Sequence, residues 1–159
     1  MLSYHGYDIV FQEVPNETSL AIEVGGCPFR CAGCHSPHMW EAGAFLDFWG
    51  LIQRYRKYIT CVCFMGGDQD PEGLKDIMRK IISETSLKIC LYTGNDNVEY
   101  LEKCGIMDYL DYVKIGPYKK DLGGLDSEKT NQRFFKVKGG LVMEDMTKCF
   151  QKKGLKKDR

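Results

Sequence analysis

The sequence lacks a long apolar segment, and it has no excess of either charge. No run of apolar residues approaches the roughly 20 that a membrane-spanning helix needs, and 22 lysines and arginines balance 22 aspartates and glutamates. An evenly charged chain has no overall basic surface with which to grip nucleic acid through its phosphates. We therefore expect neither a membrane nor a nucleic acid among the partners, and we interpret the basic tail from about residue 148 as a solvated terminus.

Histidine is also scarce, and the few histidines form no recognisable catalytic arrangement. The chain has three, His5, His35 and His38, and it shows neither a nucleophile paired with a base nor a phosphate-binding loop. The first residues lack the charged and apolar regions of a secretory signal peptide. These absences favour a cytoplasmic protein whose chemistry depends on neither a hydrolytic triad nor a bound nucleotide phosphate.

Cysteine, in contrast, is abundant. Eight cysteines in 159 residues would suggest disulfides in a small secreted protein, but in a cytoplasmic chain they indicate metal binding or chemistry. Three of them, Cys27, Cys31 and Cys34, lie in a stretch of glycines and prolines that interrupts regular structure. We call residues 25–38 the cysteine loop, because it brings three thiols to one point of the chain.

The other cysteines are spread along the chain in mostly apolar surroundings: Cys61, Cys63, Cys90, Cys104 and Cys149. We expect each of them to be a small buried hydrophobic residue. Cys61 and Cys63 stand two apart, so on a strand they share a face. That spacing leaves open a redox pair or a supplementary ligand.

The rest of the sequence alternates between strand and helix patterns, which predicts one α/β domain over residues 1–159. Its 43% hydrophobic residues are enough for a core. The patterns predict strands at 7–11, 19–24, 60–65, 87–92 and 112–115, and helices at 46–58, 71–83 and 98–104. Such alternation is typical of a parallel sheet, whose functional loops follow the carboxyl ends of the strands. We therefore expect the cysteine loop to share one rim with the loops after residues 65, 92 and 115.

Ligand chemistry limits what the three clustered thiols can hold. Thiolates select zinc, copper(I) or iron-sulfur clusters. A four-iron cluster with three protein sulfurs leaves one iron open for a substrate, so the lack of a fourth cysteine in the loop is itself a signal. A zinc site would instead need a fourth ligand, for which His35 or His38 is at hand.

The spacing Cys27-x3-Cys31-x2-Cys34 after a strand resembles the signature of the radical S-adenosylmethionine enzymes. A second motif, Met-Gly-Gly-Asp at 65–68, is similar to the segment with which those enzymes hold the amino group of that cofactor. An ammonium needs carbonyls and a carboxylate nearby, and glycines let the main chain approach closely. The resemblance implies a parallel sheet forming an open, partial TIM-like β/α barrel. It also implies a 4Fe-4S cluster on the three cysteines, with S-adenosylmethionine at the open iron.

Within that superfamily the chain most resembles the small activating proteins of anaerobic, class III ribonucleoside-triphosphate reductases. The shared features are Cys-x3-Cys-x-Gly-Cys followed by Trp40, the Gly-Gly-Asp motif, Tyr-Thr-Gly at 92–94, and Asn-Gln-Arg at 131–133 before an apolar strand. The resemblance implies reductive cleavage of S-adenosylmethionine to methionine and a 5'-deoxyadenosyl radical, which takes a hydrogen atom from a glycine of the reductase. The electron would come from an external donor such as flavodoxin, and the cofactors would carry the chemistry without a catalytic acid or base.

The same resemblance implies which residues contact S-adenosylmethionine. They are Gly33, Cys34, His35, Gly66, Gly67, Asp68 and Thr93. Many radical enzymes have an aromatic residue before the third cysteine to pack against adenine. This chain has Gly33 there, so His35 and the main chain near Gly33 are the candidates for that contact. Asp68 replaces the glutamate of the wider superfamily, and its side chain has a shorter reach.

Two alternatives stay open on the sequence. The cysteine loop is also similar to that of activases for other glycyl-radical enzymes, such as pyruvate formate-lyase, although those proteins are usually longer. The second alternative is a zinc-stabilised binding module in which His35 or His38 completes a tetrahedral site. The balanced charge and the Gly-Gly-Asp motif count against the zinc module.

Overall fold

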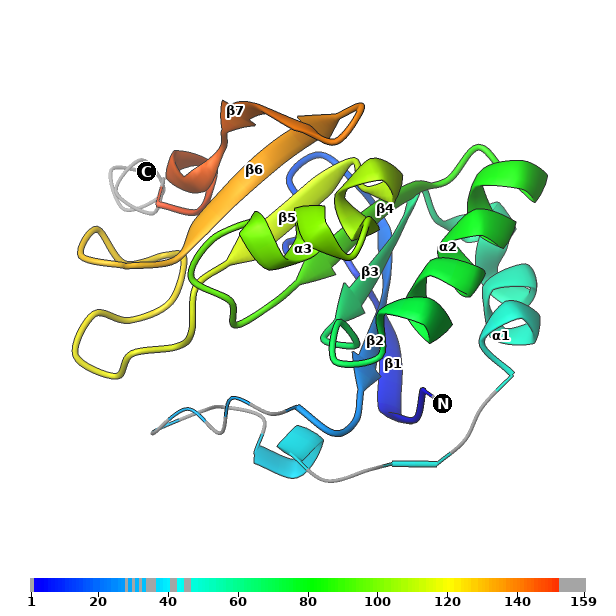
Figure 1. The fold of residues 1–159 in the computed structure, drawn as a ribbon, viewed down its shortest axis with the longest axis horizontal. Coiled ribbons are helices and arrows are strands. Elements are labelled where there is room, and N and C mark those ends of the chain that lie inside the picture. The colour runs from blue at the N-terminus through cyan, green and yellow to red at the C-terminus, as the bar shows by residue number, and fades with distance from the viewer. Residues whose placement is uncertain are drawn as a thin grey trace, which may run out of the picture.

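The strands of the chain form a single sheet, and their order across it is their order in the sequence (Figure 1). The computed structural model describes residues 2–27, 29, 31, 33, 37–40, 43–44 and 47–151, with only the main chain of residues 39 and 40. Within these residues the seven strands are β1 (Tyr4–Val10), β2 (Ser19–Val24), β3 (Cys61–Met65), β4 (Lys88–Tyr92), β5 (Tyr112–Ile115), β6 (Arg133–Lys138) and β7 (Leu141–Asp145).

The centre of the sheet is parallel, whereas its edges are antiparallel. β2, β3, β4 and β5 run parallel to one another, which confirms the α/β prediction for the core. The expectation of a parallel sheet is wrong for the edges, because β1 pairs antiparallel with β2, and β6 and β7 pair antiparallel beyond β5. The sheet has two edge strands and is therefore open, as expected, whereas its curvature into part of a TIM-like barrel is not confirmed.

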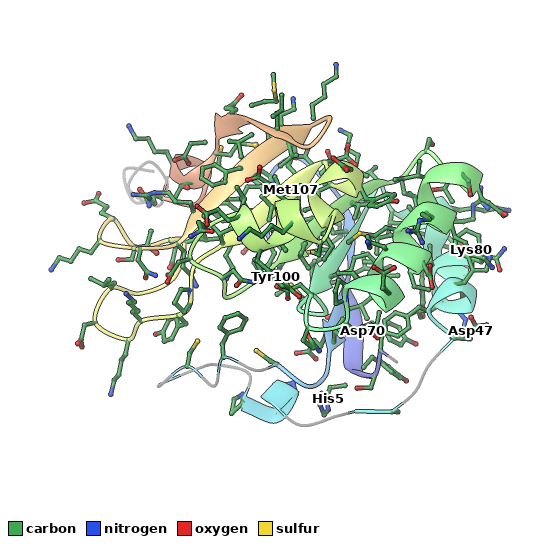
Figure 2. All side chains as sticks on the ribbon, in the orientation of Figure 1. His5, Asp47, Asp70, Lys80, Tyr100 and Met107 are labelled. Atoms are coloured by element: carbon green, nitrogen blue, oxygen red, sulfur yellow. The ribbon has the colours of Figure 1, made fainter. Side chains whose placement is uncertain are left out.

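Three α-helices connect the parallel strands: α1 (Phe48–Tyr55), α2 (Pro71–Glu84) and α3 (Glu99–Lys103). The carboxylates of Asp47 and Asp70 cap α1 and α2 by accepting hydrogen bonds from Gly50 N at 3.0 Å and Gly73 N at 3.1 Å. Figure 2 labels both aspartates at the starts of their helices. Pro71 follows the cap at Asp70, and α2 begins at the residue predicted from the sequence. None of the helices in the described residues has the length and apolar character that a membrane span requires.

The helices cover only one face of the sheet. On that face, alternate strand residues pack against the helices: Leu20, Ile22, Val24, Val62, Phe64, Ile89, Leu91, Val113 and Ile115. The helices place Phe48, Leu51, Ile52, Leu74, Met78, Ile81 and Leu101 in the same core. Consecutive parallel strands are neighbours here, and right-handed crossovers between them keep all the helices on one side. Figure 1 shows α3 in front of β4 and β5.

The other face carries a second, smaller core that no α-helix covers, and we call this face the helix-free face. Its strand residues are Ala21, Cys61, Cys63, Cys90, Tyr112 and Phe134, and connecting segments cover them with Val14, Leu125 and Met146. The strand register places residues of this helix-free face in rows across the sheet. The last row before the carboxyl ends consists of Glu23, Met65, Tyr92 and Lys114. This row therefore borders the rim at which the predicted functional loops begin.

A buried carboxylate joins the opposite, amino-terminal ends of the parallel strands. The side chain of Glu17, just before β2, is only 6% exposed. Its oxygens accept hydrogen bonds from Lys88 Nζ at 2.8 Å, Tyr112 OH at 2.8 Å and Thr60 Oγ1 at 2.7 Å. Burial by itself would raise the pKa of Glu17, but these donors and the charge of Lys88 outweigh it and lower the pKa. Glu17 thus ties the starts of β3, β4 and β5 to the segment before β2.

Replacing Glu17 with glutamine should destabilise the fold by about 1–3 kcal/mol near neutral pH, because a neutral amide satisfies the three donors poorly. Folding lowers the pKa of Glu17 below its ordinary 4.5. The wild-type advantage is therefore complete above that pH and shrinks as the pH falls through the lowered value. Urea unfolding at a series of pH values measures this, with Glu128→Gln at an exposed position as the control. A wild-type advantage that grows on acidification would contradict the assignment.

Candidate functional site

Loops that are distant in sequence meet at the carboxyl ends of β2, β3, β4 and β5. Gly66 N, after β3, donates to Tyr92 O at 3.0 Å, and Gly116 N, after β5, donates to Asn95 O at 2.6 Å. Figure 1 shows the described parts of the cysteine loop at this same end of the sheet. The four loops thus share one rim, in agreement with the interpretation of the sequence.

The Gly-Gly-Asp segment after β3 forms a turn that favours glycine. Gly66 and Gly67 have φ angles of 96° and 109°, which residues with a Cβ rarely adopt. A Cβ on Gly67 would also lie 3.4 Å from side-chain atoms of Val24 and Leu74, so the turn is closely packed. The turn delivers Asp68 to the rim with only 3% of its surface exposed.

One carboxylate oxygen of Asp68 is held by neighbouring side chains. Oδ2 accepts hydrogen bonds from Thr93 Oγ1 at 2.6 Å and Asn95 Nδ2 at 2.8 Å. The carbonyl oxygen of Asp68 accepts from the hydroxyl of Tyr100 on α3 at 2.7 Å, a residue labelled in Figure 2. Within the described residues no hydrogen bond reaches Asp68 Oδ1. That oxygen suits a cationic group such as an ammonium.

Thr93 and Asn95 thus set the orientation of Asp68. Thr93 Oγ1 also accepts from Asn95 N at 3.1 Å and Asn95 Nδ2 at 3.0 Å, which closes a compact polar turn after β4. Thr93, which the sequence predicts as a cofactor contact, lies in this turn, and its hydroxyl donates to Asp68. The interpretation of the sequence missed Asn95, although Thr-x-Asn after a strand is a turn pattern that could have indicated it.

The start of the cysteine loop is anchored to the Gly-Gly-Asp turn by Gln69. Gln69 Nε2 donates to Gly25 O at 2.9 Å, and Gln69 Oε1 accepts from Gly67 N at 3.2 Å. Gly26 follows with a φ of 77° and turns the chain away from β2. The two motifs that the sequence singles out are therefore linked directly through one amide side chain.

Two of the three predicted cluster ligands lie within the described residues. Cys27 and Cys31 are both half-buried, and neither is in a disulfide. Cys34 and His35 lie outside the described residues, and within those residues no three metal-binding side chains converge. Gly33 is exposed with a φ of 74°, and the aliphatic part of Lys120 lies 3.5 Å from the position of a Cβ there.

An aromatic ring of the cysteine loop packs on the loop after β4. A Cβ built on Gly94 would lie 2.6 Å from Cγ of Phe29, a distance that real Cβ atoms essentially never show. The absence of a side chain at Gly94 therefore makes room for Phe29. This contact fixes the middle of the cysteine loop, between Cys27 and Cys31, against the rim.

A buried lysine lies between these parts. Lys114 Nζ donates to Thr93 O and Gly116 O, each at 3.0 Å. Burial lowers the pKa of Lys114 to about 8, while the negative charges of Cys31, Asp68 and Cys27 act in the opposite direction. The ammonium group of Lys114 therefore lies close enough to the cysteine loop and to Asp68 for their charges to act on it. The interpretation of the sequence did not single out this residue.

The Asn-Gln-Arg segment fastens the loop after β5. Asn131 Nδ2 donates to Pro117 O at 3.0 Å, and Gln132 Nε2 donates to Gly116 O at 3.3 Å. Asn131 Oδ1 is buried, and no donor in the described part of the chain reaches it. A buried acceptor without a donor costs free energy, so this atom suits a donor group on a bound cofactor.

Cys61, Cys63 and Cys90 lie on the helix-free face below the rim and are fully buried. Burial raises the pKa of Cys61 and Cys90 well above that of a free thiol, so both thiols stay protonated near neutral pH. This environment supports the expected role of small hydrophobic residues over a redox pair or a supplementary ligand. Cys149 is exposed, so the expectation that it is buried is wrong.

The histidines in the described residues do not approach a metal-binding arrangement. His38 Nε2 lies 3.1 Å from Oε2 of Glu23, at the end of β2. The rings of His5 and His38 pack edge to face with their centroids 5.4 Å apart. His38 therefore contacts a carboxylate and another ring at the edge of the site.

Residues 18–134 of the chain match the model of the family described as the 4Fe-4S single cluster domain. The match extends over most of the 159 residues, and the chain belongs to this family. The matched range runs from the residue before β2 into β6, so it contains all the loops of the rim. No curated protein and no solved structure matches the chain.

Family membership agrees with the donor chemistry at the rim. Thiolates are the ligands that iron-sulfur clusters use, and Cys27 and Cys31 supply thiols there. Both lie close enough to the buried ammonium group of Lys114 for an electrostatic interaction with it. The residues present therefore fit a 4Fe-4S cluster, and the family favours iron and sulfide over the zinc alternative.

Adding a methyl group at Gly94 should weaken cluster binding, because it would displace Phe29 and the loop around it. Overpacking of this kind costs about 1–3 kcal/mol. We expect Gly94→Ala to hold clearly less iron and sulfide per chain after anaerobic reconstitution, and Phe29→Ala in the same chain to restore part of the loss. Gly124→Ala is the control, since its Cβ would meet nothing closer than 3.7 Å. Wild-type iron content in Gly94→Ala would show that the contact does not position the loop.

Proposed function

We propose that this protein is a radical S-adenosylmethionine activase that generates a glycyl radical on an anaerobic ribonucleoside-triphosphate reductase. The observation that carries the proposal is that the cysteine loop and the Gly-Gly-Asp turn meet at one rim, joined by Gln69. Membership of a 4Fe-4S family supports the cluster that this chemistry requires. The sequence motifs resemble those of the reductase activases over nearly the whole chain.

In this proposal Cys27, Cys31 and Cys34 hold three irons and leave the fourth for S-adenosylmethionine. When bound, the cluster supplies one electron that cleaves S-adenosylmethionine to methionine and a 5'-deoxyadenosyl radical, which takes a hydrogen atom from a glycine of the reductase. A low-potential one-electron donor such as flavodoxin replaces the electron. The residues of this chain bind and orient the cofactors and keep stray hydrogen donors away.

The Gly-Gly-Asp turn fits the amino group of S-adenosylmethionine. Asp68 is held in one orientation by Thr93 and Asn95, and its Oδ1 has no hydrogen bond in the described part of the chain. Gly66 and Gly67 let the main chain approach the same group. Gly33, Cys34 and His35 complete the predicted contacts, and the buried Asn131 Oδ1 offers a further acceptor.

The geometry of the rim also suits a large substrate. A glycine of another protein must reach the cofactor, so the site has to be open at the rim. Gly33, in the cysteine loop at this rim, is exposed. The partial TIM-like barrel that the resemblance implies would curl the sheet toward its helix-free face and would hold the cofactor on that side of the rim. A cytoplasmic location belongs to the same proposal, because the open iron is sensitive to oxygen.

The proposal predicts a glycyl-radical signal when reconstituted protein is incubated anaerobically with S-adenosylmethionine, a reductant and the reductase. Alanine at Cys27, Cys31 or Cys34 should abolish both methionine release and the electron-spin signal, because each thiolate holds an iron. Cys61→Ala, which removes a buried thiol elsewhere, is the matched control and should keep most of the activity. Cleavage that survives in the three loop variants would refute the ligand set. A signal on pyruvate formate-lyase and none on the reductase would identify the other activase class.

Asp68→Asn and Thr93→Val should weaken the binding of S-adenosylmethionine to the reconstituted protein. Loss of a charge-assisted hydrogen bond costs about 1.5–3 kcal/mol, or about ten- to a hundredfold in Kd. Asp68→Asn should show the larger loss, because it removes the charge, whereas Thr93→Val only releases its orientation. Anaerobic calorimetry measures both, with Thr85→Val at the far end of α2 as the control. Unchanged affinity in Asp68→Asn would rule out the proposed ammonium contact.

A further inference from the structure

Lys114 is a buried cation without a carboxylate partner in the described part of the chain. The residue is 9% exposed, in the last row of the helix-free face. Two of its three N–H groups donate to the carbonyl oxygens of Thr93 and Gly116. Carbonyls are neutral, so these bonds leave the positive charge of the ammonium group uncompensated. The third N–H has no acceptor among the described residues.

Such an arrangement is costly unless negative charge lies close by. Removing an ammonium from water costs several kcal/mol even after the protein relaxes. The negative charges that act most strongly on Lys114 are those of Cys31, Asp68 and Cys27. Two of these groups are proposed cluster ligands. We therefore expect the anion that compensates the charge of Lys114 to lie at the cysteine loop.

The hydrogen bonds of Lys114 require a donor at this position, because Thr93 O accepts from no other described residue, but a neutral donor would satisfy them equally. Gly116 O also accepts from Gln132 Nε2, so it keeps a donor without the lysine. The ring of Tyr92, 5.6 Å from Nζ, provides a weak attraction for a cation and could pack equally well against an apolar side chain. An apolar or neutral residue at position 114 would not provide a positive charge.

We propose that Lys114 supplies a fixed positive charge that stabilises the reduced state of the cluster and so raises its reduction potential. The inference rests on the ligand set of the proposed function, and it does not depend on which protein is activated. Reduction adds one electron from the external donor and makes the cluster one unit more negative, while Lys114 keeps its proton throughout. The potentials of iron-sulfur clusters follow the charge and burial around them, and charges act strongly where water is excluded. Lys114 would thus act through its charge alone and is not a catalytic residue.

A redox titration of the reconstituted protein, followed by electron-spin resonance without S-adenosylmethionine or reductase, tests this role. Lys114→Gln keeps a polar side chain but removes the charge, so its midpoint potential should shift to more negative values. Lys114→Arg keeps the charge and should stay close to the wild type. Lys88→Gln removes the same charge at the opposite end of the sheet and should leave the potential unchanged. Equal potentials in the wild type and Lys114→Gln would overturn the proposal, as would an equal shift in Lys88→Gln.

Cluster assembly provides the second measurement, in case the neutral variant does not load. Iron and sulfide content would be determined for Lys114→Gln, Lys114→Met and Lys114→Arg. Loss of the cluster from both neutral variants with retention in Lys114→Arg supports a requirement for charge. Loss from all three variants would show that the lysine only fills space, which contradicts the proposal. A wild type that titrates as described but does not cleave S-adenosylmethionine would refute the proposed function and leave the role of Lys114 standing.

Discussion

The parallel register of β2 to β5 is the constraint on which the rest of the structure depends. It places Glu23, Met65, Tyr92 and Lys114 at one level, so the loops that follow these strands begin at the same height. A slip of one residue in β5 would turn Lys114 toward the helices and Val113 toward the other face. The meeting of the cysteine loop with the Gly-Gly-Asp turn is a consequence of this alignment.

The two ends of the parallel strands differ in whether their buried charged side chains have a partner of opposite charge. At the amino-terminal end, Glu17 has a cationic partner in Lys88 and two hydroxyl donors, so its charge is compensated within the fold. At the carboxyl end, Lys114 lacks a carboxylate partner among the described residues, and Asp68 keeps one oxygen without a donor there. In α/β proteins the carboxyl ends of the strands carry function and the opposite ends carry stability. The charges of this chain follow that division.

Local sequence signals were sufficient for much of the core. The strand predicted at 112–115 agrees with β5, and the cap and proline at 70–71 set the start of α2. The helix predicted over 46–58 is shorter, because α1 ends at Tyr55 and a 3-10 turn follows at Arg56–Tyr58. The antiparallel edges escaped prediction, since strand direction depends on pairing between distant segments and leaves little trace in composition.

The candidate site, like the fold, has one part that local sequence signals predicted and another part that they did not. The cysteine loop and the Gly-Gly-Asp turn are short motifs that can be read directly in the sequence, and their resemblance to those of known enzymes led to the prediction of a cluster and its cofactor. Asn95 acts through a hydrogen bond to Asp68, and Lys114 acts through electrostatic interactions with Asp68 and the cysteine loop. These partners are distant in the sequence, so no local pattern reveals them. Lys114 did leave one signal, because a lysine between Val113 and Ile115 interrupts an otherwise apolar strand. A charge inside a covered strand needs a partner, and that requirement points to the site.

The proposed function requires a cluster with one iron free of protein ligands. The most direct test is a Mössbauer spectrum of protein reconstituted with isotopically enriched iron, recorded before and after addition of S-adenosylmethionine. One iron of the cluster should change its signal on addition, while the others keep theirs. A spectrum that does not respond to S-adenosylmethionine, from a cluster whose irons are all bound by the protein, would contradict the proposed function.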